Sequence, residues 1–115
     1  MNTQAQIHQV DLSIEEANKN IRRMNALIKL SNNKEYKEIF LDGYFNAFAI
    51  KQVLLKADLT QQSEADQLQI MKNIDAIGAL RIHLQSVITL GRQSEAAIQD
   101  DERTREELLL EEAAA

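Results

Sequence analysis

Apolar side chains recur with a helical period along most of this chain. In the first third they stand alternately three and four residues apart, at Ile7, Val10, Ile14, Ala17, Ile21, Met24 and Ile28. That spacing puts all seven on one stripe of a helix, as in a coiled-coil seam. Ser13 and Glu16 match a capping box, so we predict a helix over about 13–30, with the stretch before Ser13 either extending it or packing separately. Ser31 to Asn33 supply a stop and a new N-cap.

A second helix is predicted over about 34–56, and it contains every aromatic residue of the chain: Tyr36, Phe40, Tyr44, Phe45 and Phe48. Between Ile39 and Leu55 its apolar residues cover more than half of the circumference, and a helix that is apolar nearly all round is buried. We therefore expect it to lie between its two neighbours. Gly43 is expected either to bend the helix or to admit a close neighbour.

A third helix is predicted over about 63–90, with Ile70, Ile74, Ile77, Leu84 and Ile88 in heptad register. Gly78 is a possible seat for one of the aromatic rings, and Gly91 is expected to end the helix or to weaken it. Beyond Gly91 the same register falls on Glu95, Ile98, Glu102, Arg105 and Leu109, of which only two are apolar. A solvated helical arm therefore fits this segment better than a core helix.

The sequence thus predicts an all-α protein: a three-helix bundle over residues 1–91, followed by an acidic helical arm over 92–115. With 115 residues the chain makes one domain at most. Proline is absent and glycine occurs three times, which favours helix throughout. The apolar seams can be intramolecular or shared between subunits, and their extent favours a homo-oligomer.

Composition excludes several kinds of chemistry. The chain has no cysteine, hence no disulfide, thiolate nucleophile or cysteine-based zinc site. No apolar run is long enough to span a membrane, and the N-terminus lacks the pattern of a signal peptide. His83 has no His, Asp or Glu within four residues, and adjacent carboxylates such as Asp100 and Asp101 point about 100° apart on a helix. We predict no catalytic, cofactor-binding or metal-binding residues, and no enzyme.

The charge is unevenly spread. Residues 1–56 carry eight Lys or Arg against six Asp or Glu, whereas residues 57–115 carry five against twelve. The acidic C-terminal part repels phosphate, so nucleic-acid binding is not expected. A small basic patch on the first helix, comprising Lys19, Arg22, Arg23 and Lys29, leaves a DNA-associated accessory role as a weaker reading.

Three short stretches resemble small helical proteins encoded by tailed bacteriophages. They are Phe40-Leu41-Asp42-Gly43-Tyr44-Phe45, Ile74-Asp75-Ala76-Ile77-Gly78-Ala79-Leu80-Arg81, and the Glu-rich run that begins at Arg105-Glu106-Glu107-Leu108. The resemblance covers about residues 30–112, and it brings no functional residues with it. It implies a phage gene product that is a virion or assembly component, present in the host cytoplasm during assembly and then in the virion.

The sequence therefore favours a structural or assembly protein that binds itself or a larger virion protein. The residues expected at the contact surface are the five aromatic ones, Tyr36, Phe40, Tyr44, Phe45 and Phe48, and the three leucines Leu108, Leu109 and Leu110. An alternative from another class is a small phage regulator that inhibits a host protein, with the acidic C-terminal segment occupying a basic cleft.

Overall fold

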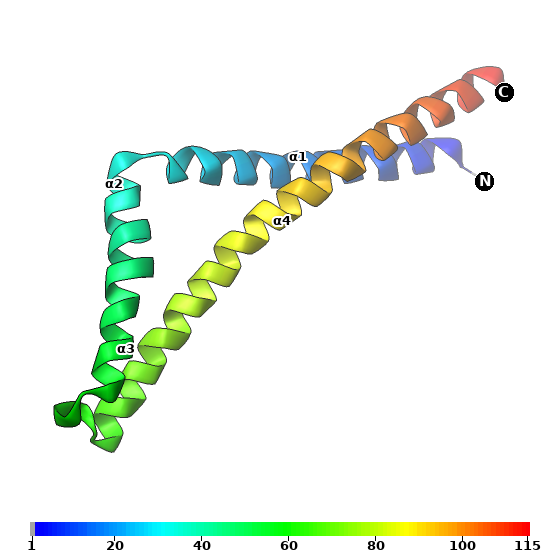
Figure 1. Cartoon of the computed structure of the whole chain (residues 1–115). Helices are drawn as coiled ribbons and strands as arrows, with labels where there is room; N and C mark the ends of the chain where they lie inside the picture. Colours follow the sequence, from blue (N-terminus) through cyan, green and yellow to red (C-terminus); the bar gives the residue numbers. More distant parts are fainter. Residues whose placement is uncertain (1) are drawn as a thin grey trace. The chain divides into compact units, whose positions relative to one another are not determined.

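The computed structural model describes residues 2–115, and nearly all of them are helical (Figure 1). Helix α1 spans Thr3–Ser31. The middle helix begins with α2, Lys34–Tyr36, continues as the π-helix η1, Lys37–Phe48, and ends with α3, Ala49–Ala57. A short 3-10 turn, η2, covers Leu59–Gln61, and α4 covers Glu64–Ala114. The prediction of an all-α protein with three main helices is confirmed. Among residues 2–115, no helix is long and apolar enough to cross a membrane.

The helices pack in pairs and do not share one bundle core. One compact unit combines the chain up to Leu27 with Val87–Ala115, and the other comprises Ile28–Ser86. The predicted compact three-helix bundle is therefore wrong. The predicted boundary between bundle and arm near residue 91 lies inside α4, which continues as one helix to Ala114.

In the first unit, α1 and the C-terminal half of α4 run antiparallel. The contacts follow in opposite order along the two helices. Asn20 Nδ2 donates to Ser94 Oγ at 3.1 Å, Ser13 Oγ to Asp101 Oδ2 at 2.6 Å, and Gln4 Nε2 to Glu112 Oε1 at 3.2 Å. The C-terminal half of α4 is therefore the partner of α1, and it is not a free arm.

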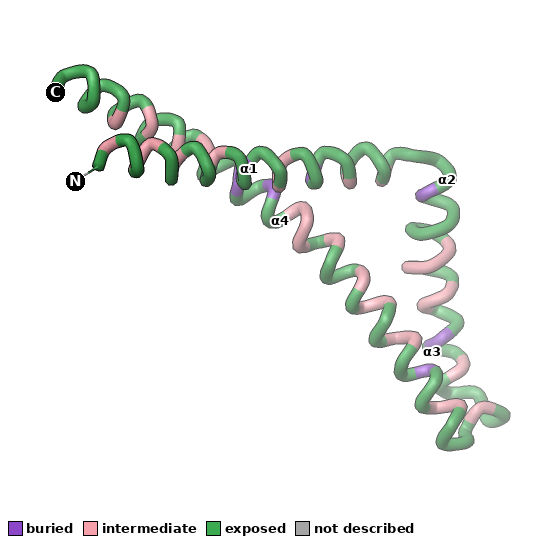
Figure 2. Tube along the Cα trace, turned by 180° about the vertical axis from the view of Figure 1, so that it is seen from behind, coloured by how far each residue is buried: buried purple, intermediate pink, exposed green. Residues whose placement is uncertain are grey.

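The seam predicted on α1 faces this partner. Ala17 and Met24 are buried, and the remaining seam positions up to Met24 are half-buried, namely Ile7, Val10, Ile14 and Ile21 (Figure 2). The helix begins at Thr3, ten residues before the predicted capping box. Ser13 is consequently a mid-helix residue whose hydroxyl binds α4 and caps nothing.

The closest approach of the two helices is at Gly91. A Cβ atom built on Gly91 would lie 2.8 Å from Met24 Cγ and nearer still to Met24 Cβ. Only a residue without a side chain fits there, and Gly91 itself is buried. The sequence predicts that Gly91 either ends the third helix or weakens it. The first alternative is wrong, because α4 continues through the glycine, which permits close packing against Met24.

The seam on α4 differs from the predicted heptad register beyond Gly91. Ser94 is buried and Asp101 and Leu108 are half-buried, whereas their neighbours Glu95, Glu102 and Leu109 are exposed. Two successive three-residue steps, from Ile88 to Gly91 and from Gly91 to Ser94, move every second seam position by one residue. Ile98 and Arg105 keep their predicted places on the seam. Such a break in a heptad pattern rotates the contacting face of a helix.

In the second unit, the middle helix is continuous from residue 34 to 57. The Asn33 side chain caps it by accepting a hydrogen bond from the Tyr36 backbone N–H at 2.9 Å. Its π-helical part is twelve residues long, whereas most π-helical stretches are single turns. A Cβ on Gly43 would lie 2.9 Å from the carbonyl oxygen of Glu38, five residues earlier. Gly43 therefore neither bends the chain sharply nor seats a neighbour, and its missing side chain leaves room for the carbonyl of its own helix.

The contrast between Gly78 and Gly91 gives a stability prediction. A Cβ on Gly78 would meet nothing within 4 Å. Gly78→Ala is therefore expected to raise the free energy of unfolding by about 1 kcal/mol, the helix-propensity gain. Gly91→Ala is expected to lower it by roughly 1–3 kcal/mol, as overpacking does. Urea unfolding followed by circular dichroism measures both. Equal stabilisation by the two substitutions would contradict the close Met24 contact.

The turn before α4 gives a pH prediction. The pKa of the Asp58 carboxyl lies below its ordinary 3.8, first because the carboxylate accepts a hydrogen bond from the Thr60 backbone N–H and second because it accepts one from the Thr60 hydroxyl. The stabilisation from this cap is complete above the unfolded pKa and disappears as the pH falls through the lower folded pKa. An NMR titration of Asp58 is expected to have a midpoint below 3.8.

A matched variant tests the cause of that shift. Thr60→Val removes the hydroxyl hydrogen bond and keeps the backbone one, so the midpoint is expected to rise only part of the way. A wild-type midpoint at or above 3.8 would disprove the capping role of Asp58.

Candidate interaction surface

Helix α3 has two different faces. Gln52 is only 2% exposed, whereas Ile50, Val53 and Leu54 are 53%, 64% and 67% exposed. At about 100° per residue, the spacing of three and four residues puts these three on one stripe, and Gln52 lies on the opposite side. We call Ile50, Val53 and Leu54 the α3 stripe. It is an apolar helix face that no part of its own unit covers.

The covered face of α3 and the turn that follows it make side-chain amide hydrogen bonds with α4. Asn73 Nδ2 donates to Gln52 Oε1 at 3.1 Å, and the single buried apolar residue of this half of α4 is Ile70, at 4% exposure. Gln67 Nε2 donates to the carbonyls of Lys56, at 3.1 Å, and Gln61, at 2.8 Å. These amide contacts fix the turn and the pairing of α3 with α4 while burying little apolar area.

The aromatic residues are not the centre of a core. Tyr36 is buried, Phe40 is 39% exposed, and Tyr44, Phe45 and Phe48 are half-buried. They contact one another along the helix: the ring centroids of Tyr36 and Phe40 are 5.0 Å apart and stacked, and those of Tyr44 and Phe48 are 5.6 Å apart and stacked. The rings therefore form a ladder on the helix surface.

The expected seat for a ring at Gly78 is wrong, since nothing lies within 4 Å of the Cβ position there. Within the second unit, η1–α3 and α4 meet at the turn and separate with distance from it (Figure 1). The helices do not form the compact bundle that the predicted sandwich requires. The middle helix has one long neighbour in its unit, and its apolar residues Ile39, Ile50, Val53 and Leu54 are exposed.

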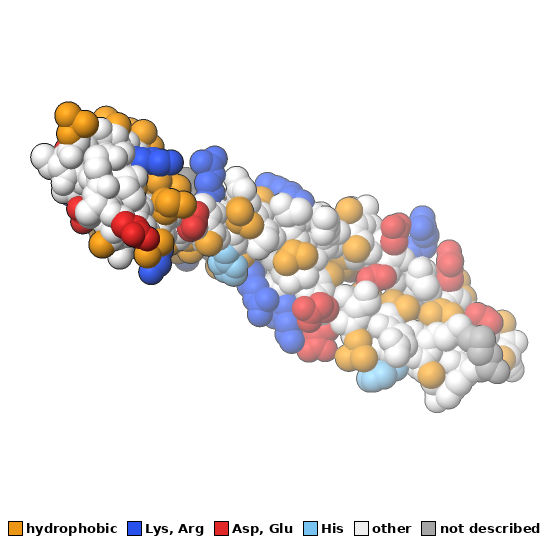
Figure 3. All heavy atoms as spheres, turned by 90° about the horizontal axis from the view of Figure 1, so that it is seen from below, with side chains coloured by type: hydrophobic (Ala, Val, Ile, Leu, Met, Phe, Trp, Pro, Cys, Tyr) orange, Lys and Arg blue, Asp and Glu red, His pale blue; other side chains and the backbone are white. Residues whose placement is uncertain are grey.

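The surface of α4 adds further apolar side chains in the same unit. Leu68, Met71 and Ile82 are 51%, 52% and 68% exposed. Hydrophobic side chains lie at the surface between charged ones on the face that Figure 3 presents. Single exposed hydrophobic residues are normal for a protein surface, so the grouped α3 stripe is the more informative feature.

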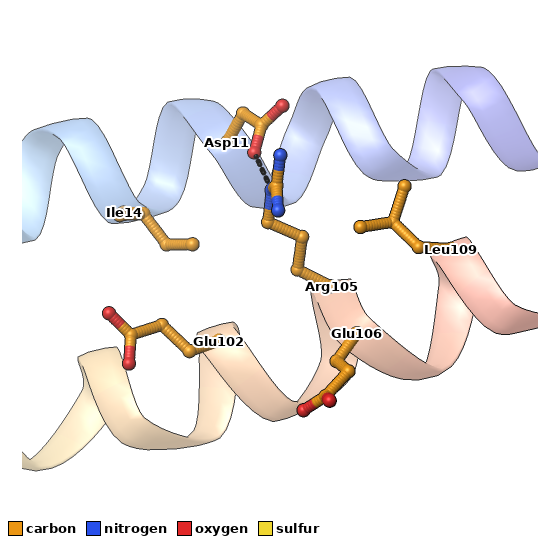
Figure 4. A pocket seen from close by; sticks show the side chains of 6 residues that line it. All are labelled: Asp11, Ile14, Glu102, Arg105, Glu106 and Leu109. Carbon is orange, nitrogen blue, oxygen red and sulfur yellow. Dashed lines mark hydrogen bonds and ion pairs between the residues drawn. The ribbon is translucent and has the colours of Figure 1, made fainter.

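In the first unit, a groove of about 550 Å³ lies between α1 and α4 (Figure 4). Arg105 reaches across it and its Nε contacts Asp11 Oδ1 at 2.6 Å. Ile14 and Leu109 point into the gap between the helices, while Glu106 points away from α1. The groove brings together one arginine that is already paired and three carboxylates, which gives no arrangement for catalysis. Both partners of the Arg105 pair are over 40% exposed, so the pair contributes about 1 kcal/mol or less.

Of the three leucines predicted for the contact surface, one is half-buried and two are exposed. Leu108 is half-buried on the seam with α1, whereas Leu109 and Leu110 are 41% and 67% exposed. Neither histidine, His8 or His83, is covered. Among residues 2–115, no group of three or more His, Cys, Asp or Glu side chains is placed to hold a metal ion.

Compared with protein-family models, curated proteins and solved structures, the chain shows no significant match.

The sequence interpretation overlooked the α3 stripe. Its signal is in the sequence, because Ile50, Val53, Leu54 and Ala57 have the spacing of one helix face. Because other sides of the same helix are apolar as well, this spacing does not single out one face in the sequence. The pair of Gln52 and Asn73 was also overlooked, since a lone glutamine in an apolar run gives no indication of its partner.

The polar pair gives a prediction for stability. Asn73→Leu leaves the buried Gln52 amide without its hydrogen bond, and we expect a loss of about 1–3 kcal/mol in the free energy of unfolding. The double variant Gln52→Leu with Asn73→Leu is expected to recover most of this loss, because no buried polar group remains. Urea unfolding of wild type, both single variants and the double variant measures the coupling. Additive effects of the two substitutions would contradict it.

Proposed function

We propose that this protein is a non-enzymatic structural or assembly protein of a tailed bacteriophage, which works by binding protein partners through its exposed apolar helix faces. The observation that carries this proposal is the α3 stripe, three large apolar side chains that are each more than half exposed. The opposite face of α3, which carries Gln52, is covered by α4. The α3 stripe is the face that is left for a partner.

The chemistry of the stripe favours a protein partner over a small ligand. Small-molecule sites are concave and enclose most of the ligand, whereas the stripe is the convex face of a helix. Fully burying a Val, Leu or Ile side chain is worth about 1.5–3 kcal/mol. Covering the exposed part of the three side chains therefore contributes on the order of 3–5 kcal/mol. That is enough to drive association only when neighbouring residues add to it, since association costs about 4–15 kcal/mol.

The resemblance to small phage proteins supplies the biological setting. The protein would act in the host cytoplasm during assembly and then remain in the virion. A phage virion repeats one subunit contact many times, so a moderate apolar contact is strengthened by multiple simultaneous contacts.

The alternative, a regulator that uses its acidic segment against a host protein, has less support. Asp101 and Arg105 of that segment already bind Ser13 and Asp11 of α1. Their engagement makes this half of α4 a packing element of its own unit. Other acidic residues of the segment, such as Glu107, are exposed and could still bind a host protein. The experiment below therefore includes the regulator as one of its outcomes.

Mass spectrometry of purified phage particles tests the proposal. The wild-type protein is expected at many copies per particle. Leu54→Glu is expected to reduce the copy number about tenfold or more, since a loss of only 1.4 kcal/mol in binding corresponds to tenfold. Ile82→Glu is the matched control, because Leu54 and Ile82 are equally exposed, at 67% and 68%, and only Leu54 belongs to the α3 stripe.

Circular dichroism of both variants shows whether they fold. Absence of the wild-type protein from particles, with recovery alongside a single host protein, would replace the assembly role with the regulator. Equal incorporation of the two glutamate variants would show that the α3 stripe is not the binding surface.

A further inference from the structure

We infer that the π-helical segment η1 is a conformational switch for the α3 stripe. When η1 converts to an α-helix, α3 turns about its axis by roughly half a turn and the stripe packs against α4. This inference rests on the proposed function, in that it takes the stripe to be a binding surface, and it states how that surface is withdrawn from a partner. The evidence is the burial of α3, the geometry of η1 and the surface of α4 that α3 faces.

The burial of α3 is inverted. The Gln52 amide is 2% exposed, whereas the three apolar residues of the α3 stripe are each more than half exposed. Gln52 Oε1 accepts a hydrogen bond from Asn73 Nδ2 of α4 at 3.1 Å. An amphipathic helix ordinarily buries its apolar face and leaves its polar face in water. The direction that α3 faces is therefore not the one that its own side chains favour.

The π-helix that precedes α3 contributes to this direction. Helix η1 has twelve residues, and α2, η1 and α3 follow one another without a break. A π-helix has about one residue more per turn than an α-helix, so twelve residues in the two geometries differ by roughly half a turn. The centre of the α3 stripe lies about 150° from Gln52. An added half turn therefore brings the stripe to within about 30° of the direction that Gln52 has now.

Helix α4 has an apolar surface where it meets α3. Ile70 is 4% exposed and Ile74 is half-buried, and both share a helix face with Asn73, which binds Gln52. In the α-helical form of η1 the stripe would lie against these isoleucines, and Gln52 would be solvated. Asn73 would keep a bond within α4, since its Oδ1 accepts from Gln69 Nε2 at 2.9 Å.

The rotation falls on α3 and not on the other end of the middle helix. That end is capped by Asn33, and Tyr36 in its first turn is 8% exposed. Turning it would bring Tyr36 into water, whereas turning α3 covers three large apolar side chains. The partner and α4 therefore compete for the same stripe. A partner that binds the stripe stabilises the π-helical form, because a ligand shifts an equilibrium by its differential affinity for the two states.

Gly43 allows the switch to be set by substitution. A Cβ on this residue would lie 2.9 Å from the carbonyl oxygen of Glu38, which is too close for the π-helical geometry to persist. Alanine is also the best α-helix former, so Gly43→Ala is expected to convert η1 to an α-helix. Gly78→Ala is the matched control, because the same substitution there meets nothing within 4 Å.

Thiol labelling measures which face of α3 is covered, since the sequence has no cysteine. Leu54→Cys and Gln52→Cys place single thiols where the native side chains are 67% and 2% exposed. The thiol at position 54 is expected to react at least tenfold faster than the one at position 52. Adding Gly43→Ala is expected to reverse this order, and adding Gly78→Ala is expected to leave it unchanged. Unchanged labelling in the Gly43→Ala chain, or the same reversal with Gly78→Ala, would overturn the inference.

A disulfide tests the rotated form in a chain that keeps Gly43. Leu54 now lies on the side of α3 away from Asn73, so the pair Leu54→Cys with Asn73→Cys can cross-link within one chain only after the rotation. Mild oxidation is expected to trap this disulfide at least tenfold faster than in the control pair, Leu54→Cys with Asp75→Cys. Asp75 is exposed and lies about 200° further round α4 than Asn73. Equal rates for the two pairs would overturn the rotation, whether or not Gly43→Ala folds.

The outcomes separate this inference from the proposed function. Reversed labelling in a Gly43→Ala chain that still enters phage particles at the wild-type copy number would retain the switch and remove the stripe as the binding surface. Loss of incorporation with Leu54→Glu, together with labelling and cross-linking that show no rotation, would retain the proposed function and remove the switch.

Discussion

The rest of the structure depends on the close contact between Met24 and Gly91. It sets α1 against the C-terminal half of α4, and the seam of α1 up to Met24 turns towards that partner. A methionine side chain can approach a helix backbone this closely only where the opposing residue lacks a Cβ. The middle helix has α4 as its one long neighbour in its own unit.

The pairing of the helices accounts for the exposed apolar residues on the surface of the second unit. The middle helix is apolar on most sides, yet its residue that is buried against α4 is Gln52, which is bonded to Asn73, and the buried apolar residue of α4 in this unit is Ile70. The single hydrogen bond between Gln52 and Asn73 helps to fix the register of the pairing, but it buries little apolar area. The α3 stripe is consequently exposed because of how the helices are paired, and not because the sequence lacks hydrophobic residues there.

The long π-helical segment η1 belongs to the same middle helix as the α3 stripe. Within this wider helix, Gly43 leaves room for the carbonyl of Glu38. The stacked rings of Tyr44 and Phe48 lie along this segment and support it from one side. Stretches of π-helix are frequent at functional sites, and η1 leads directly into the α3 stripe.

The sequence by itself determined the helices, because their period, caps and lack of proline are local properties. The seam from Ile7 to Met24 could be assigned to a contacting face for the same reason. Tertiary structure decided which helix that seam meets. The slip at Gly91, which puts Ser94 and Asp101 inward in place of Glu95 and Glu102, arises from the approach of a residue far away in the chain. The exposure of Ile50, Val53 and Leu54 follows from that choice, since a sequence shows that a helix is apolar all round but not how many neighbours it will have.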